Sequence, residues 1–158
     1  MPSIDIAGHE VLFDEEDAHL FSETRWQIRA SGATAYVQRS IYSGSDYQGY
    51  ESLHRLIAGC STDQVVDHIN CNGLDNRRSN LRVCSHAQNM QNRKIHSNNQ
   101  SGFKGVYFDP AAHCLPWRAQ IRANGKKHNL GRFSSAVAAH QAYLKAAQKL
   151  HGEFARAA

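Results

Sequence analysis

A polar stretch between two short apolar runs constrains the fold of this chain more than any other feature. Residues 70–80 are rich in Asn, Asp and Arg, and they separate the β-branched run 64–69 from the run 81–84. Such a stretch is typical of a loop held by side-chain hydrogen bonds. With helical character at 86–93, the sequence predicts the order strand, long loop, strand, helix.

Segments on either side complete two small units. Before the polar loop, the sequence predicts strands at 10–13, 25–30 and 34–41 and a short acidic helix at 14–21. A loop at 43–49 and a helix at 50–58 follow, and the helix has Leu53, Leu56 and Ile57 on one face. The segments expected after a polar linker at 95–101 are strands at 103–108, 117–123 and 127–130, an Asn124-Gly125 hairpin turn, and a helix that is capped by Ser134 and runs to Leu150. The fold class is therefore α+β, with one domain at 1–97, comprising parts 1–63 and 64–94, and another at 98–158.

The charge of the chain is strongly divided. Residues 1–66 hold four Arg against ten Asp and Glu, a net charge of −6, whereas residues 67–158 hold fourteen Lys and Arg against four acids, a net charge of +10. A basic balance of this size indicates a surface that meets phosphates. A membrane is a poor partner, because the basic residues are interleaved with Asn, Gln and Ser and no apolar run approaches the roughly 18 residues of a span. The acidic start lacks the pattern of a signal peptide, so we expect an intracellular protein with its four cysteines reduced.

The residues that carry chemistry lie around the polar loop. Asp67 and His68 end the first strand, while Asn80 and Asn89 fall where the second strand and the helix turn back toward it. The histidine supplies an imidazole that can take a proton from water. The Asp and Asn side chains supply oxygen donors for a hard cation. A phosphodiester hydrolase requires both. Magnesium suits one carboxylate and one amide because it keeps several waters, whereas zinc prefers more nitrogen or sulfur.

Three motifs run through this region: Val66-Asp67-His68-Ile69-Asn70, Asp75-Asn76-Arg77-Arg78-Ser79-Asn80-Leu81-Arg82, and Gln88-Asn89-Met90-Gln91-Asn92. Together they resemble the HNH (His-Asn-His) nucleases, specifically the phage and intron-encoded homing endonucleases whose last motif position is Asn. The resemblance implies a ββα-metal (His-Me finger) unit with His68 as general base, Asn80 orienting the site, and Asp67 and Asn89 binding one Mg²⁺ or Mn²⁺, with no zinc. Cys71 stands where relatives usually carry Gly, which would allow a positive φ.

A second set of motifs lies near the C-terminus: Ser101-Gly102-Phe103-Lys104-Gly105-Val106, Trp117-Arg118-Ala119-Gln120-Ile121-Arg122, Leu130-Gly131-Arg132-Phe133, and Gly152-Glu153-Phe154-Ala155. This set resembles the APETALA-type (ethylene-response-factor) DNA-binding domain, in which a three-stranded antiparallel sheet lies in the major groove and one helix packs behind it. The alternation agrees, because Arg118, Gln120 and Arg122 share one face of the middle strand. The other face is expected to meet the helix through five of its residues: Val137, Ala139, Tyr143, Ala146 and Leu150.

The residues expected to contact double-stranded DNA form two groups, for which ion pairing or plain solvent exposure is the alternative role. They are Arg77, Arg78 and Arg82 at the loop, and Lys104, Tyr107, Arg118, Gln120, Arg122, Lys127 and Asn129 on the sheet. His54 is expected to be structural. The acidic segment 1–66 either braces the nuclease unit or repels DNA except along the basic side.

These features predict a metal-dependent DNA endonuclease of the homing type that nicks double-stranded DNA. It would act as a monomer, or as a dimer assembled on DNA, in the cytoplasm of a bacterial or phage-infected cell. Two alternatives stay open: a DNA-binding regulator whose nuclease unit is inactive, and a nuclease toxin without sequence preference. Intact Asp67, His68 and Asn89 favour the enzyme over the regulator.

Overall fold

The structure is a computed structural model, and it describes residues 2–22, 24–32, 34–95 and 98–156. The chain divides into two compact units, residues 1–86 and 87–158. This division precedes nearly all of helix α2 (His86–Asn92), whereas the sequence predicts a boundary near residue 98. Residues 96 and 97 of the expected linker lie outside the described residues. The limits of the functional domains therefore stay a prediction.

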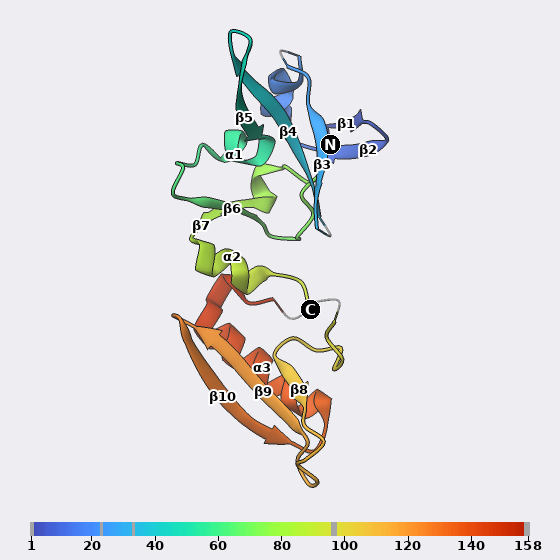
Figure 1. Cartoon of the computed structure of the whole chain (residues 1–158), viewed down its shortest axis with the longest axis vertical. Helices are drawn as coiled ribbons and strands as arrows, with labels where there is room; N and C mark the ends of the chain where they lie inside the picture. The colour runs from blue at the N-terminus through green and yellow to red at the C-terminus, as the bar shows by residue number, and fades with distance from the viewer. Residues whose placement is uncertain (1, 23, 33, 96–97, 157–158) are drawn as a thin grey trace. The chain divides into compact units, whose positions relative to one another are not determined.

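Three antiparallel strands form the larger sheet of the first unit (Figure 1). They are β3 (Gln27–Ser31), β4 (Thr34–Ser43) and β5 (Asp46–Ser52), in the order β3–β4–β5. The other elements around this sheet are the hairpin of β1 (Ser3–Ile6) and β2 (His9–Leu12), the 3₁₀ helix η1 (Glu15–Phe21), and helix α1 (Leu53–Ala58). The expected strands and the acidic helix are confirmed within a few residues, while β1 was not predicted.

An apolar core lies between this sheet, α1 and the β1–β2 hairpin. Its buried members are Val11, Trp26, Val37, Leu53 and Ile57. Leu56 packs against the same cluster, so the expected apolar face of the helix is confirmed. The helix ends at Gly59, whose φ of 59° suits the residue that follows a helix.

The prediction of a loop at 43–49 is wrong, because residues 46–49 belong to strand β5. Ser43 lies opposite Asp46 in a tight hairpin, and Gly44 in the turn has a φ of 64°. Gly49 lies inside the strand with a φ of 132°, next to a shift in register. Glycine serves both at turns and at β-bulges. The two glycines that suggested a loop therefore make a turn and an irregular strand.

The polar loop joins two short paired strands, as the sequence predicts. β6 (Val65–His68) pairs antiparallel with β7 (Leu81–Cys84), and a 3₁₀ turn, η2 (Arg78–Asn80), ends the loop before β7. Helix α2 then follows where helical character was expected.

The second unit is a three-stranded antiparallel sheet with one helix on it (Figure 1). The strands are β8 (Val106–Phe108), β9 (Trp117–Ala123) and β10 (Lys126–Phe133), with β9 in the centre, and the helix α3 (Ala136–His151) is followed by the 3₁₀ turn η3 (Gly152–Phe154). Asn124 and Gly125 join β9 to β10 with φ values of 50° and 72°. Two positive φ values match a type I′ hairpin turn, so the predicted turn is confirmed.

Helix α3 packs on the face of β9 that carries Ala119 and Ile121, as predicted. Its buried residues recur every fourth position: Ala139, Tyr143, Ala147 and His151. Two of the residues expected to point inward are instead exposed, Val137 at 56% and Leu150 at 38%. The N-cap is Ser135, which accepts a hydrogen bond from the Ala138 backbone N–H, and not Ser134. Ala139 and Tyr143 are therefore confirmed as inward-facing, whereas Ala147 and His151 were not predicted.

The four cysteines, Cys60, Cys71, Cys84 and Cys114, are all free thiols. Within the described part of the chain, no helix combines the length and the apolar character needed to cross a membrane. Overall the chain is a mixed α+β protein built from small antiparallel sheets and few helices.

Candidate active site and nucleic-acid surface

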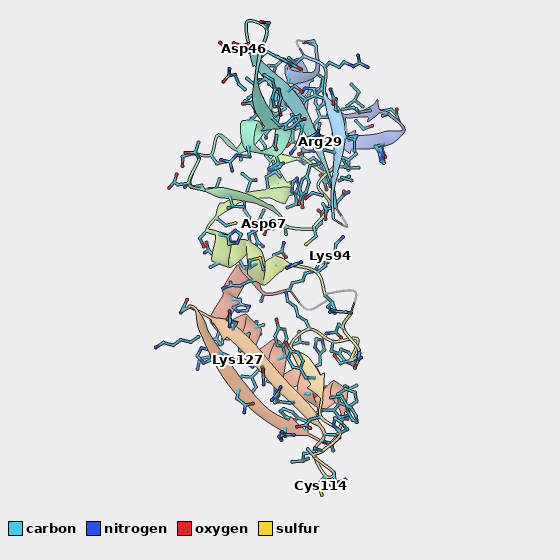
Figure 2. All side chains as sticks on the ribbon, in the orientation of Figure 1. Arg29, Asp46, Asp67, Lys94, Cys114 and Lys127 are labelled. Atoms are coloured by element: carbon cyan, nitrogen blue, oxygen red, sulfur yellow. The ribbon has the colours of Figure 1, made fainter. Side chains whose placement is uncertain are left out.

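Asp67 and His68 lie at the end of β6, and each side chain is only 5% exposed. Pairing with β7 places Asp67 opposite Arg82. Arg82 donates hydrogen bonds to Oδ2 of Asp67 from Nε at 2.9 Å and from Nη2 at 2.6 Å. Figure 2 labels Asp67 on this strand. The short β6–β7 ladder therefore fixes a buried carboxylate beside a buried imidazole.

The ring of His68 lies in an aromatic cluster that the sequence did not predict. The His54 ring contacts it edge-on with 5.0 Å between centroids, and the Tyr36 ring lies 5.9 Å away. Tyr36 and His54 are 5.5 Å apart, so the three rings pack on one another. The sequence predicts a structural role for His54, because its position on a core helix is the only signal there. The structure places it against the candidate general base.

Burial lowers the pKa values of both histidines. For His68, a hydrogen bond with Asn76 and the charges of Asp67 and Asp75 oppose this lowering of the pKa without cancelling it. For His54, burial and the charges of His68 and Arg55 lower the pKa to about 3. His68 is therefore a neutral imidazole near pH 7, which is the form that accepts a proton.

The loop is held by a hydrogen-bond network centred on Asn80, whose role in orienting the site stays a prediction. The side-chain Nδ2 of Asn80 donates to the Asp75 carbonyl at 2.8 Å and to Asn70 Oδ1 at 3.0 Å. Its Oδ1 accepts from the Asn70 backbone N–H at 3.1 Å. Asn70 in turn donates to the Asp75 carboxylate at 2.8 Å. These bonds tie both ends of the loop together next to His68.

The acidic N-terminal segment braces this loop. The Leu12 backbone N–H donates to the Leu74 carbonyl, and the Asn76 N–H donates back to the Leu12 carbonyl. Asp14 and Asp17 both accept hydrogen bonds from Arg78, Asp14 from its backbone N–H at 2.7 Å and Asp17 from its guanidinium at 2.8 Å. Asp17 itself is 2% exposed. Of the two roles considered for the segment, these contacts support bracing.

The three loop arginines all hold ion pairs, which was the alternative considered for them. Arg77 pairs with Asp75, whose carboxyl pKa it lowers, and Arg82 pairs with Asp67. The Arg78 side chain also pairs with Glu16 and remains 49% exposed. Phosphate contact by these arginines stays a prediction, and Arg78 has the most exposed side chain of the three.

The predicted metal ligands, Asp67 and Asn89, lie in different units. Asn89 is partly buried on α2. Because it belongs to the second unit and Asp67 to the first, joint metal binding by the two residues stays a prediction. A carboxylate and an amide oxygen are donors that suit a hard divalent cation. Among the described residues, no three or more His, Cys, Asp or Glu side chains gather in a way that would hold a metal.

The sheet of the second unit carries the predicted polar residues in adjacent rows. Register places Arg118 opposite Arg132, Gln120 opposite Asn129, and Arg122 opposite Lys127. Tyr107 lies opposite Arg118 on the other edge, with the guanidinium 5.8 Å from its ring centre. Arg132 was not predicted as a contact residue, although it lies in the quoted Leu-Gly-Arg-Phe motif; it pairs with Asp109 at 2.6 Å.

Two predicted contact residues of this sheet are less accessible than expected. Gln120 is only 9% exposed, whereas its neighbour Arg122 is exposed. Lys104 donates through Nζ to the carbonyls of Gln91 and Arg93, at 2.5 and 2.9 Å, near the end of α2. A lysine there satisfies carbonyls at a helix C-terminus. Of the basic residues predicted to contact DNA in this unit, Arg122 and Lys127 are exposed, and so are Lys126 and Arg132 of β10, which were not predicted.

Comparisons with known proteins agree with the first set of motifs. A family model described as HNH endonuclease matches residues 60–91. The chain is 32% identical over 137 residues to the "Uncharacterized HNH endonuclease L560" of Acanthamoeba polyphaga mimivirus, which covers 83% of this chain and 69% of the viral protein. It is 33% identical over 91 residues to "Protein 3.8" of Escherichia phage T7, covering 58% of this chain and 73% of the phage protein. No solved structure matches the chain significantly.

Proposed function

The chain belongs to the HNH endonuclease family, and from this premise we propose that it is a metal-dependent DNA endonuclease of the homing type. It nicks double-stranded DNA by phosphodiester hydrolysis, as a monomer or as a dimer assembled on the DNA. One observation carries the proposal: buried His68 directly follows buried Asp67 at the end of β6, inside the segment that the family model matches. Burial also lowers the pKa of His68, which favours the form that accepts a proton.

His68 is the general base of this reaction. Its imidazole takes a proton from the attacking water as the new P–O bond forms and the bond to the 3′ oxygen breaks. Asn80 keeps the loop, and with it the end of β6, in place through its bonds to Asn70 and Asp75. Asp67 and Asn89 would hold one Mg²⁺ or Mn²⁺, which supplies positive charge at the scissile phosphate.

The second unit is proposed to bind the DNA and to read part of its sequence through the sheet face opposite α3. Support comes from the rows of Arg118, Arg122 and Lys127 on β9 and β10, and from the net charge of +10 over residues 67–158. The APETALA-type resemblance of residues 98–158 belongs to this proposal as well.

One observation favours the alternative of an inactive DNA-binding regulator. Arg82 donates two hydrogen bonds to Oδ2 of Asp67, which is one of the two proposed metal ligands. A cation at Asp67 would share the carboxylate with this guanidinium. The two functions predict opposite results in a cleavage assay.

The test is nicking of a supercoiled plasmid that carries the DNA flanking the gene, with Mg²⁺ or Mn²⁺ and with EDTA. Wild-type protein, His68→Ala and His9→Ala are compared. His9 is an exposed histidine of the same unit and serves as the matched control. Unfolding followed by Trp26 fluorescence in a Trp117→Phe background shows whether the first unit of each variant folds. Added imidazole tests whether a free base restores cleavage to His68→Ala.

Open circles that need the metal, survive in His9→Ala and fall at least about 100-fold in His68→Ala are the expected result. Recovery of the folded His68→Ala variant by imidazole would support a base at this position. A mobility shift without cleavage in every variant would favour the regulator. Equal cleavage by His68→Ala and wild type would remove His68 from the chemistry.

A further inference from the structure

The β3–β4–β5 sheet has a second face that does not point into the apolar core. Residues opposite one another on antiparallel strands point to the same face of the sheet. Val37 and Ile28 are such a pair and pack into the core, whereas Tyr36 and its partner Arg29 lie on the other side. Figure 2 labels Arg29 on this sheet.

Three exposed tyrosines extend this face along β4 and β5. Tyr42 lies opposite Tyr47 with 5.8 Å between ring centroids, and Tyr47 lies 5.2 Å from Tyr50. Their exposed fractions are 60%, 50% and 44%. The Arg29 guanidinium stacks 3.7 Å from the centre of the Tyr50 ring. We call this set of Arg29, Tyr36, Tyr42, Tyr47 and Tyr50 the tyrosine face.

The tyrosine face carries no carboxylate from its own strands, although residues 1–66 have a net charge of −6. Every residue of β3, β4 and β5 is described, and their acids are Asp46 and Glu51. Glu51 pairs with Arg39 on the core-facing side, and Asp46 lies opposite Ser43 at the hairpin tip, where Figure 2 labels it. An anionic ligand is therefore not repelled by this face of the sheet.

One end of the tyrosine face reaches the candidate active site. Tyr36 packs 5.9 Å from the His68 ring, and Tyr42 lies six residues further along the same strand. Six residues of strand span about 20 Å. At the roughly 3.4 Å rise of a duplex strand this length corresponds to roughly six nucleotides, and it holds fewer where unpaired bases are drawn apart.

We propose that the tyrosine face binds the DNA next to the scissile phosphate, with unpaired bases stacking on Tyr42, Tyr47 and Tyr50. The inference rests on the proposed function, because it takes His68 as the place where the DNA is cut. Aromatic rings stack on any base, and an arginine against the same rings adds a cationic contact, as in proteins that hold single strands. The surface thus extends the substrate from duplex DNA to nucleotides that are unpaired at the cut site.

The test measures binding of a fluorescein-labelled oligothymidylate of about twelve nucleotides to the full chain in EDTA, so that no cleavage occurs. The double variant Tyr47→Ala/Tyr50→Ala is compared with Tyr47→Phe/Tyr50→Phe, which keeps both rings. Ile41→Ala is the matched control, because Ile41 is exposed next to Tyr42 but on the opposite face. Cross-linking with an iodouracil-substituted oligonucleotide then maps the contacts.

We expect the alanine pair to weaken oligothymidylate binding about ten-fold or more, while the phenylalanine pair and Ile41→Ala bind as wild type. The slope of affinity against salt should stay unchanged, since no phosphate contact is removed. Cross-links should fall on Tyr42, Tyr47 or Tyr50.

Unchanged affinity in the alanine pair, with cross-links confined to residues 98–158, would overturn the proposal and leave these tyrosines as a surface for another kind of partner. Plasmid nicking by the same variants separates this result from the proposed function. If the wild-type protein nicks the plasmid and the alanine pair binds oligothymidylate normally, only the proposal that the tyrosine face binds DNA is wrong. If no variant nicks but the alanine pair loses binding, only the hydrolase assignment is wrong.

Discussion

The loop between β6 and β7 in the first unit buries polar side chains, whereas the sheet of the second unit buries apolar ones against α3. Asp75, Asn76 and Asn80 are each at most 7% exposed in the loop, and Ala119 and Ile121 are at most 3% exposed in β9. Buried polar groups stabilise a fold only when they are hydrogen-bonded, while apolar packing depends on volume and shape. The two regions should therefore fail for different reasons.

Each unit contains one of the two tryptophans of the chain, which allows the regions to be compared separately. Trp26 is in the core of the first unit, and Trp117 packs in the core of the second. Denaturant unfolding of Trp117→Phe reports the first unit, and that of Trp26→Phe reports the second. The predictions below use these two backgrounds.

The largest loss of stability is expected from Gly105→Ala in the second unit. An added Cβ would collide with the Tyr143 ring and lie 2.5 Å from the Gln120 carbonyl, at a φ of 72°. We expect a loss of roughly 3–5 kcal/mol from overpacking and backbone strain together. Unfolding followed by Trp117 measures it. Gly125→Ala is the control, because Gly125 has the same φ with nothing within 4 Å; equal losses in both would mean that packing contributes nothing.

The next largest effect is expected from Asn80→Ala in the polar loop. The change removes three hydrogen bonds and leaves a buried carbonyl of Asp75 without its side-chain donor. We expect a loss of roughly 2–4 kcal/mol in unfolding followed by Trp26, and weaker plasmid nicking. Asn72→Ala should cost less than about 1 kcal/mol, because exposed Asn72 accepts one local bond from Leu74. If the two variants are equally stable, the network does not hold the loop.

Acid should destabilise the first unit through His54. Its folded pKa of about 3 lies below the unfolded value near 6.5, so the unfolded chain binds more protons between these values. The stability is complete above about pH 6.5 and is lost as the pH falls toward 3, on the order of 2–3 kcal/mol between pH 7 and pH 4. His54→Phe keeps a ring against Tyr36 and His68 but should lose this part of the slope. A slope identical to wild type would show that His54 does not titrate in this range.

The smallest effect is expected at Cys71, which has a φ of 57° in the loop. Glycine adopts this conformation without strain, but it also loses more backbone freedom on folding. Cys71→Gly should therefore stabilise the first unit by about 1 kcal/mol or less, while Cys71→Ala should change little. Unfolding followed by Trp26 measures both, and a destabilised glycine variant would contradict the strain at this position.

Local patterns predicted several elements well. The limits of β9 were predicted without error, the Asn124-Gly125 turn has both positive φ values, and the β6–loop–β7 order is as expected. Alternation, turn residues and β-branched runs act over a few neighbouring residues, so the sequence displays them directly. At Cys71 the sequence showed only a departure from glycine, and the structure shows that the cysteine nevertheless keeps a positive φ.

Contacts between distant segments were not predictable in this way. His54 against His68, Arg78 with Asp17, and Arg29 over Tyr50 each join residues that are far apart along the chain. The sequence showed which side-chain types are present, and it indicated His68, Asp67 and Asn80 as candidate residues of a hydrolytic centre. Only the tertiary structure decided which charges pair, which polar groups are buried and which tyrosines share a face, because these depend on how separate strands and loops pack in space.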